Sequence, residues 1–179
     1  MAFLFLYLAV RTLLGALVRS RRGLHVKDIL SLRQALIRIE RVQRAVPMLS
    51  YEDVVAAIDW LAKAFGFREQ GMRHTDTQGR VTHAELGLDG AVVMLGWPGP
   101  DYRSPARHAE DCEQARRWLA TPWVVDGVLV SVEDVDRHCE RAKAAGATIL
   151  RELDDQPFGR LYSAVDLEGH RWMFLQPTA

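Results

Sequence analysis

The sequence predicts an α+β fold built from two similar units, each containing a strand, a helix and three further strands. The first observation is an internal repeat, because LSYEDV at residues 49–54 is answered by VSVEDV at residues 130–135. AKAFGF at residues 62–67 is likewise answered by AKAAGA at residues 142–147. The second observation is length, because neither unit alone is long enough to bury a good core. We therefore expect the two units to pack together.

The first unit, residues 46–96, begins with a short strand at 46–50. Ser50 and Asp53 form an S-x-x-D pattern that predicts the start of a helix, and Gly66 predicts its end. Apolar residues at helical spacing predict the buried face of this helix: Val54, Ile58, Leu61 and Phe65. Three strands are expected at 67–74, 81–86 and 91–95, separated by turns at Gln78-Gly79 and Asp89-Gly90.

The second unit, residues 123–176, repeats this plan. A strand is expected at 127–132, followed by a helix that starts at Ser131 and Asp134 and buries Val135, Cys139 and Ala142. Later strands are expected at 148–152, 160–166 and 171–175. The connecting segment, residues 97–122, is rich in proline at first and then helix-like at 108–119. Long connections of this kind often cover a functional site.

Residues 1–44 differ in composition from the rest of the chain and predict a helical leader before a domain at 45–179. Residues 1–22 are very apolar, which leaves membrane contact open, but Arg11 would cost about 2.5 to 3.5 kcal/mol at the centre of a spanning helix. Residues 27–46 have the apolar spacing of an amphipathic helix. The leader weakly resembles the beginnings of some integrase-type transposases, without their catalytic core.

Composition and charge exclude several classes of function. Lys and Arg total 23 and Asp and Glu total 23, so a nucleic-acid partner is not expected. Cys112 and Cys139 have no metal-binding spacing and do not resemble a secreted disulfide framework. A cytoplasmic location fits this cysteine content, with the leader as an alternative route to a membrane.

Several motifs together resemble the vicinal oxygen chelate superfamily, the group of glyoxalases, bleomycin resistance proteins and dioxygenases. They are PMLSYED at residues 47–53, HAEL at 83–86 and DQPFGRLYSAVDLEGHRWMF at 155–174. The resemblance implies a glyoxalase-like open barrel made from the paired units. It also implies a fold that hosts isomerases, transferases, dioxygenases and drug-binding proteins, with dimers common among them.

Enzymes of this superfamily hold one divalent ion with side chains from the first and last strands of each unit. The corresponding positions here fall near Val46, Leu95, Gly127 and Phe174, none of which can bind a metal. A register error of one residue would bring in proline, valine or methionine, which are no better. No metal or other cofactor is therefore expected at these positions.

An apolar and aromatic ligand site is expected instead. Strand alternation predicts that the concave faces carry Val46, Met48, Val93, Leu95, Leu129, Trp172 and Phe174. Aromatic residues flanking the connecting segment could stack on a planar ligand, with ordinary packing as the alternative. The expected ligand-binding residues are Met48, Trp97, Tyr102, Trp123, Leu129, Tyr162, Trp172 and Phe174.

Three hypotheses of function follow. The first is metal-independent binding and sequestration of an aromatic or amphipathic small molecule. The second is a lyase, isomerase or dioxygenase in which His83 and Glu85, with His74, act as catalytic groups or hold a divalent metal at a non-standard site. The third is a sensor attached to a membrane or a partner through the leader. A homodimer is compatible with each of them.

Overall fold

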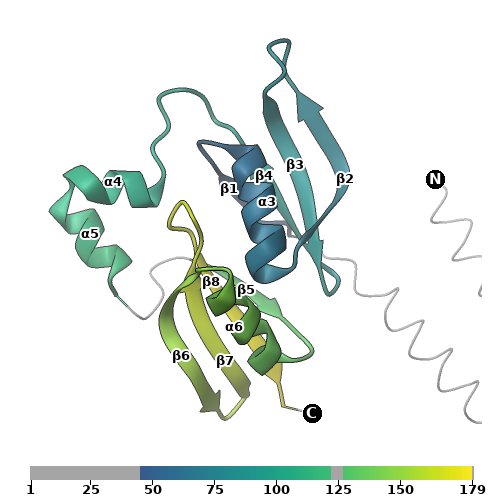
Figure 1. The fold of residues 1–179 in the computed structure, drawn as a ribbon, viewed down its shortest axis with the longest axis vertical. Coiled ribbons are helices and arrows are strands. Elements are labelled where there is room, and N and C mark those ends of the chain that lie inside the picture. The colour runs from purple at the N-terminus through teal and green to yellow at the C-terminus, as the bar shows by residue number, and fades with distance from the viewer. Residues whose placement is uncertain (1–44, 122–126, 179) are drawn as a thin grey trace, which may run out of the picture. The chain divides into compact units, whose positions relative to one another are not determined.

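A computed structural model describes residues 45–121 and 127–178 of the chain. The expectations for the leader therefore lie outside the described residues, as does Trp123 in the connection. Figure 1 shows the order of the elements along the chain. In the parts described, no helix is long and apolar enough to cross a membrane.

The first unit forms a four-stranded sheet with the strand order β1-β4-β3-β2. Its elements are β1 (Met48–Ser50), α3 (Val54–Phe65), β2 (Arg68–Thr75), β3 (Val81–Leu88) and β4 (Ala91–Gly96). β1 pairs with β4 in parallel, whereas β2, β3 and β4 are antiparallel neighbours. The β3–β4 turn is tight because Asp89 and Gly90 both have positive φ angles, 48° and 87°.

The second unit forms a separate sheet with the corresponding order, β5-β8-β7-β6. Its elements are β5 (Val128–Ser131), α6 (Val135–Ala144), β6 (Thr148–Gln156), β7 (Gly159–Val165) and β8 (Arg171–Pro177). β5 pairs with β8 in parallel, matching β1 and β4 in the first unit. The predicted α+β fold of two βαβββ units is thus confirmed.

The helices begin three to four residues later than the S-x-x-D patterns predicted. Asp53 itself caps α3, accepting hydrogen bonds from the backbone of Val55 and Ala56, and Asp134 caps α6 in the same way through Arg137. Ser50 belongs to β1 instead. An aspartate is among the strongest N-cap residues, so the nearer side chain takes this role. Gly66 ends α3 in the left-handed conformation, as expected.

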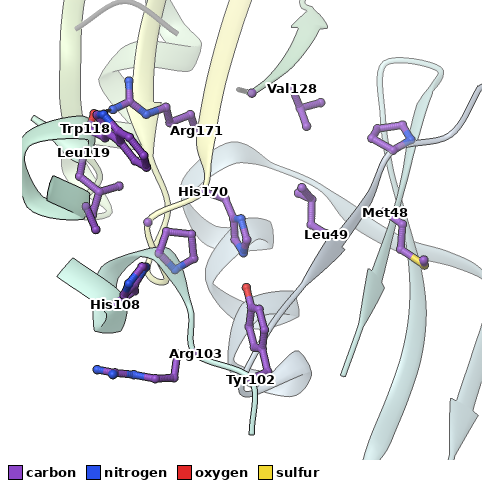
Figure 2. A pocket seen from close by; sticks show the side chains of 15 residues that line it. Met48, Leu49, Tyr102, Arg103, His108, Trp118, Leu119, Val128, His170 and Arg171 are labelled. Atoms are coloured by element: carbon purple, nitrogen blue, oxygen red, sulfur yellow. Dashed lines mark hydrogen bonds between the residues drawn. The ribbon is translucent and has the colours of Figure 1, made fainter. Parts of the chain in front are cut away.

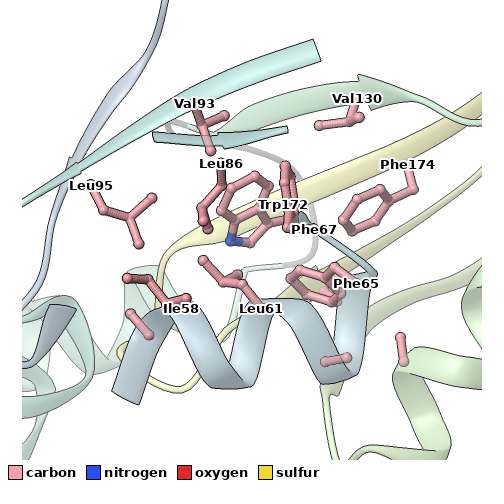
Figure 3. Packing of buried hydrophobic residues seen from close by; sticks show 14 of the residues in the cluster. Ile58, Leu61, Phe65, Phe67, Leu86, Val93, Leu95, Val130, Trp172 and Phe174 are labelled. Atoms are coloured by element: carbon pink, nitrogen blue, oxygen red, sulfur yellow. The ribbon is translucent and has the colours of Figure 1, made fainter. Parts of the chain in front are cut away.

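The hydrophobic core contains residues from both units (Figure 3). Phe65 ends α3, and Phe67 lies between α3 and β2; their rings lie 5.7 and 5.2 Å from the ring of Trp172 on β8. Phe65 also lies 4.7 Å from Phe174, again between ring centres. Burial of each large aromatic ring contributes about 1.5–3 kcal/mol through the hydrophobic effect. The two units therefore share one core.

On the last strand of each unit, the side chains expected on the open face point into the core, and their sequence neighbours take the open face. Val93, Leu95, Trp172 and Phe174 are buried in the core, so they cannot belong to an open wall with Met48 and Leu129. Side chains alternate along a strand, and their neighbours Met94 and Met173 point to the opposite faces. The expectation of a wall containing all of these residues is wrong.

The open faces instead pair apolar side chains across neighbouring strands. Met48 on β1 is the register partner of Met94 on β4, and Leu129 on β5 is the partner of Met173 on β8. Met48 is 68% exposed and Leu129 is 48% exposed. These four positions are equivalent in the two units, and none of them carries a polar side chain.

Candidate functional site

A pocket of about 620 Å³ lies beside β1, at the junction of the two units and the connecting segment (Figure 2). The connecting segment contributes α4 (Pro105–Asp111) and α5 (Glu113–Leu119). The lining residues come from four places: Pro47, Met48 and Leu49 at β1; Tyr102, Arg103, Pro105, His108, Ala115, Trp118 and Leu119 in the connection; Gly127 and Val128 at β5; and Gly169, His170 and Arg171 before β8. This pocket is the candidate site.

The connecting segment is held over the first unit by polar contacts to Glu52. One carboxylate oxygen of Glu52 accepts a hydrogen bond from the backbone N–H of Ser104 at 2.8 Å. The other accepts one from Nη1 of Arg107, also at 2.8 Å. These contacts lower the pKa of Glu52, first through the Ser104 N–H and then through Arg107. The carboxylate therefore stays ionised and fixes the start of α4.

The turn between β7 and β8 joins the second unit to the start of α3. The Glu168 carboxylate accepts hydrogen bonds from the backbone N–H groups of Glu52 and Asp53 at 2.8–3.1 Å. Its carbonyl oxygen also accepts the N–H of Ala106, at 2.9 Å. Burial raises the pKa of Glu168, and the two backbone hydrogen bonds oppose this effect. One residue thus contacts both the helix start and α4.

Asp166 fixes the same turn from the interior. Its Oδ1 accepts hydrogen bonds from the backbone N–H groups of Glu168 and His170 at 3.0 and 2.9 Å. Its Oδ2 accepts one from the hydroxyl of Tyr51 at 2.6 Å and one from Nε1 of Trp172 at 3.0 Å. Burial raises the pKa of Tyr51 well above its usual value, so the hydroxyl remains a donor. A buried carboxylate with four donors is well compensated.

Two side chains at the pocket meet at the carbonyl oxygen of Ser50. The hydroxyl of Tyr102 donates to this oxygen at 2.7 Å, and Nε2 of His170 donates to it at 2.8 Å. Burial raises the pKa of Tyr102 to about 12, with the carboxylates of Glu168, Asp166 and Glu52 acting in the same direction. Tyr102 therefore keeps its proton.

The outer wall of the pocket is formed by α5. Trp118 is 53% exposed, and its backbone carbonyl accepts a hydrogen bond from Arg171 of β8. Nη1 of Arg171 also donates to the carbonyl of Thr121, at 2.6 Å. On α4, His108 lines the pocket, while Arg103 donates to Asp111 at 2.6 Å. The pocket thus combines an aromatic wall with a small number of polar groups.

Comparison with known proteins places the chain in a family. The model of the Glyoxalase/Bleomycin resistance protein/Dioxygenase superfamily matches residues 39–174. This chain belongs to that superfamily. An uncharacterized protein of Mycobacterium bovis is 34% identical over 137 residues, covering 74% of this chain and 82% of the relative. A relative in Mycobacterium tuberculosis is equally similar, with 73% of its length covered.

Solved structures of superfamily members have the same fold. TioX from Micromonospora sp. ML1 is 36% identical, with a TM-score of 0.55 and coverage of 76% of this chain and 98% of TioX. UcmS2 is 22% identical, with a TM-score of 0.53 and coverage of 75% and 98%. A glyoxalase-related enzyme from Clostridium phytofermentans is 15% identical, with a TM-score of 0.53 and coverage of 76% and 96%. The last two likenesses concern the fold alone.

The metal positions of superfamily enzymes do not fit a metal here. Val46 and Gly127 precede β1 and β5, and Leu95 and Phe174 are buried in the core. The side chains that do reach the open faces of the last strands are Met94 and Met173, and their cross-strand partners are Met48 and Leu129. Thioether and aliphatic groups are poor ligands for Zn²⁺, Mn²⁺ or Mg²⁺.

His83 and Glu85 lie on the open face of the first sheet, away from the pocket lining. Nε2 of His83 is 3.8 Å from Oε1 of Glu85, and the ring of His74 on β2 lies 6.0 Å from that of His83. Within residues 45–121 and 127–178, no three His, Cys, Asp or Glu side chains are grouped closely enough to hold a metal ion. The two residues are thus brought together as predicted, without forming a complete metal site.

The remaining predicted ligand-binding residues divide into three groups. Met48 and Tyr102 line the pocket. Trp97 lies under the guanidinium of Arg80, 3.9 Å from the ring centre, and Leu129 is on the open face of the second sheet. Tyr162, Trp172 and Phe174 are fully buried in the core, where they contact neither the pocket nor solvent.

Sequence reasoning did not identify most of the pocket lining, including its polar residues His108, His170 and Arg171. The sequence places His170 directly after the Glu168-Gly169 turn, and such a position favours a structural role. The structure gives His170 that role through its bond to Ser50, while also placing its ring at the pocket. The HAEDCEQARRWL stretch predicted one helix, but the chain forms two, with Cys112 between them in an extended conformation.

Proposed function

We propose that this superfamily member binds a small aromatic or amphipathic molecule in the pocket and sequesters it without a metal ion. The observation that carries the proposal is the combination of an aromatic pocket with the apolar side chains of Met48, Met94, Leu129 and Met173 on the open faces of the sheets. Met48 belongs to both features, because it lines the pocket and also occupies the open face of β1. The superfamily includes bleomycin resistance proteins, which makes sequestration a natural expectation for a site of this kind.

The chemistry of the lining supports a flat ligand. Trp118 and Tyr102 offer aromatic surfaces from the connecting segment, and Leu119 and Val128 offer aliphatic ones. Aromatic rings bind planar molecules by offset or edge-to-face contact, worth about 0.5–1.5 kcal/mol per pair beyond the burial of area. The polar groups at Ser50 and on α4 would orient such a ligand.

Calorimetry on the full-length protein tests ligand binding with a panel of planar aromatic compounds and aromatic antibiotics, bleomycin among them. Met48→Glu places a carboxylate in the pocket and should weaken binding about tenfold or more, because that charge loses water when the ligand enters. Met72→Glu is the matched control, because Met72 is also exposed and lies outside the pocket lining. Equal effects of the two substitutions would count against this pocket as the site.

The enzyme hypothesis keeps one supporting observation, the proximity of His83, Glu85 and His74 on the open face. Metal analysis of the full chain, as purified and after reloading with Ni, Zn, Mn and Fe(II), separates it from sequestration. We expect far less than one ion per chain. Stoichiometric metal that disappears in His83→Ala or Glu85→Ala would favour a lyase, isomerase or dioxygenase.

The homodimer stays a prediction. Exposed apolar side chains on both open faces, Met48 and Leu129, are compatible with a second copy of the chain packing there. Sedimentation equilibrium of the full chain measures the mass directly. Leu129→Glu should shift a dimer toward monomer, and Met72→Glu serves as the control for an added charge.

A further inference from the structure

The carbonyl oxygen of Ser50 uses the donor groups of two pocket residues. It accepts the hydroxyl proton of Tyr102 at 2.7 Å and the Nε2 proton of His170 at 2.8 Å. Tyr102 comes from the connecting segment and His170 from the β7–β8 turn, so the two side chains approach β1 from different parts of the chain (Figure 2). What each group still offers to a ligand follows from this shared bond.

His170 is left with an acceptor. In a neutral imidazole with the proton on Nε2, Nδ1 carries a lone pair and accepts hydrogen bonds. Nδ1 of His170 has no partner among the described residues. Every buried side-chain nitrogen or oxygen atom in this part of the chain has a partner, so an Nδ1 without one must be accessible. His170 lines the pocket, so this accessible nitrogen belongs to a side chain at the site.

Tyr102 is also left with an acceptor. Its only hydroxyl proton points to Ser50, and a hydroxyl oxygen has two lone pairs that remain able to accept. The ring of Tyr51 lies 4.7 Å from the ring of His170, nearly edge-on, and limits rotation of the imidazole. Nδ1 of His170 and the hydroxyl oxygen of Tyr102 can thus accept hydrogen bonds from a ligand, whereas the donors of both side chains are already bonded to Ser50.

Resting on the function proposed above, we infer that the pocket selects hydroxyaryl ligands, whose phenolic O–H donates to His170 or Tyr102 while the ring packs on Trp118. An apolar ligand without a donor would bury these acceptors unpaired, which weakens binding. A phenol satisfies one of them and keeps the aromatic surface that the pocket accommodates. The ligand class is therefore defined by a donor at one edge of a flat ring system.

Two probes of nearly equal size test this inference on the full chain: 2-naphthol and 2-methylnaphthalene. Their dissociation constants are measured by equilibrium dialysis. The methyl compound is the more hydrophobic, so a pocket without acceptors would prefer it. We expect the opposite order, with 2-naphthol binding about tenfold or more tightly, because an unpaired buried acceptor is costly.

His170→Phe is the central variant, because it removes the Nδ1 acceptor, together with the Nε2 donor, and keeps a planar ring at the pocket. Tyr102→Phe removes the second acceptor. His74→Phe is the matched control, because His74 is exposed and lies outside the pocket lining. His108→Phe tests the other histidine that lines the pocket. The naphthol preference should fall in His170→Phe or Tyr102→Phe and persist in His74→Phe. Thermal unfolding of each variant shows whether it is folded.

The possible failures are distinguishable. Equal binding of both probes to the wild type, or a preference unchanged in both His170→Phe and Tyr102→Phe, overturns the selection for phenols while leaving a ligand-binding pocket. Loss of preference in His108→Phe alone assigns recognition to α4 and also overturns the inference. Absence of binding by either probe, together with a negative ligand panel, overturns the proposed function as well.

Discussion

Nε2 of His138 in α6 lies 2.9 Å from the carbonyl oxygen of Phe65 at the end of α3, and it donates a hydrogen bond across the junction of the two units. Nδ1 of the same ring accepts the hydroxyl of Tyr162 at 2.7 Å. The guanidinium of Arg141 donates to the same carbonyl, also at 2.9 Å. This neutral imidazole is buried, and a proton on Nδ1 would meet the Tyr162 hydroxyl with one donor facing another.

The pH dependence of stability should reflect His138. Burial, assisted by Arg141, lowers its pKa from 6.5 to about 4. Between pH 6.5 and 4, this histidine is protonated in the unfolded chain but neutral in the folded chain. Its contribution to the free energy of unfolding is therefore complete above pH 6.5 and is lost as the pH falls toward 4. The free energy of unfolding should fall by up to about 3 kcal/mol over this range. Urea denaturation at pH 7 and at pH 4.5 measures the change.

His138→Gln provides the comparison, because glutamine can both donate and accept but does not titrate. Glu168 acts in the opposite direction, since a raised carboxyl pKa favours the folded state as the pH falls. The difference between wild type and His138→Gln isolates the histidine. The same pH slope in both proteins would contradict the assignment.

Asp166→Ala should strongly destabilise the fold. The substitution leaves the Tyr51 hydroxyl and the Trp172 indole N–H without their buried acceptor. Each unsatisfied group costs about 1–3 kcal/mol, so a loss of about 3 kcal/mol is expected in chemical denaturation. Asp155→Ala is the control, because Asp155 only pairs with Arg160 on the surface. A comparable loss in Asp155→Ala would refute the conclusion that the buried hydrogen bonds to Asp166 stabilise the fold.

Glu52→Ala should loosen the connecting segment without unfolding the domain. Without this carboxylate, the Ser104 N–H and the Arg107 guanidinium lose their acceptor. Amide exchange measured by mass spectrometry should become faster for residues 102–111 and stay unchanged in α3. Glu110→Ala removes an exposed carboxylate from the same segment and should have no such effect. Uniform acceleration across the domain would instead indicate global destabilisation.

Gly159→Ala should cost more stability than Gly79→Ala. Both glycines have positive φ angles, 146° and 81°. A Cβ atom at Gly159 would lie 2.3 Å from the carbonyl oxygen of Gln176, whereas one at Gly79 meets nothing within 4 Å. The Gly79 variant should lose about 1 kcal/mol from backbone strain alone, and the Gly159 variant clearly more. Thermal unfolding ranks the two, and the reverse order would contradict the backbone contact.

The sequence was sufficient to predict the fold, because the repeat carries the same strand and helix pattern twice. The buried face of α3 was also predicted, since Val54, Ile58, Leu61 and Phe65 follow helical spacing. The cavity wall was predicted wrongly, because a strand has a period of two residues. A one-residue error at Leu95 or Phe174 therefore moves a side chain from an open face to the core.

The candidate site was harder to predict for a different reason. At its polar centre, Tyr102 and His170 both donate to the carbonyl oxygen of Ser50. They lie 52 and 120 residues from Ser50 along the chain. The acceptor is a backbone carbonyl oxygen, which every residue carries, so the residue type does not reveal it. Tyr102 was identified because aromatic residues gather in the connection, but nothing in the sequence pairs it with His170.

The connecting segment breaks the symmetry of the repeat. The core and the strand order are duplicated, but the chain contains this segment once, and it forms one wall of the pocket beside β1. A pocket that requires α4 and α5 can therefore form once per chain. Binding should saturate at one molecule per polypeptide rather than two, so the duplicated scaffold yields a single functional unit.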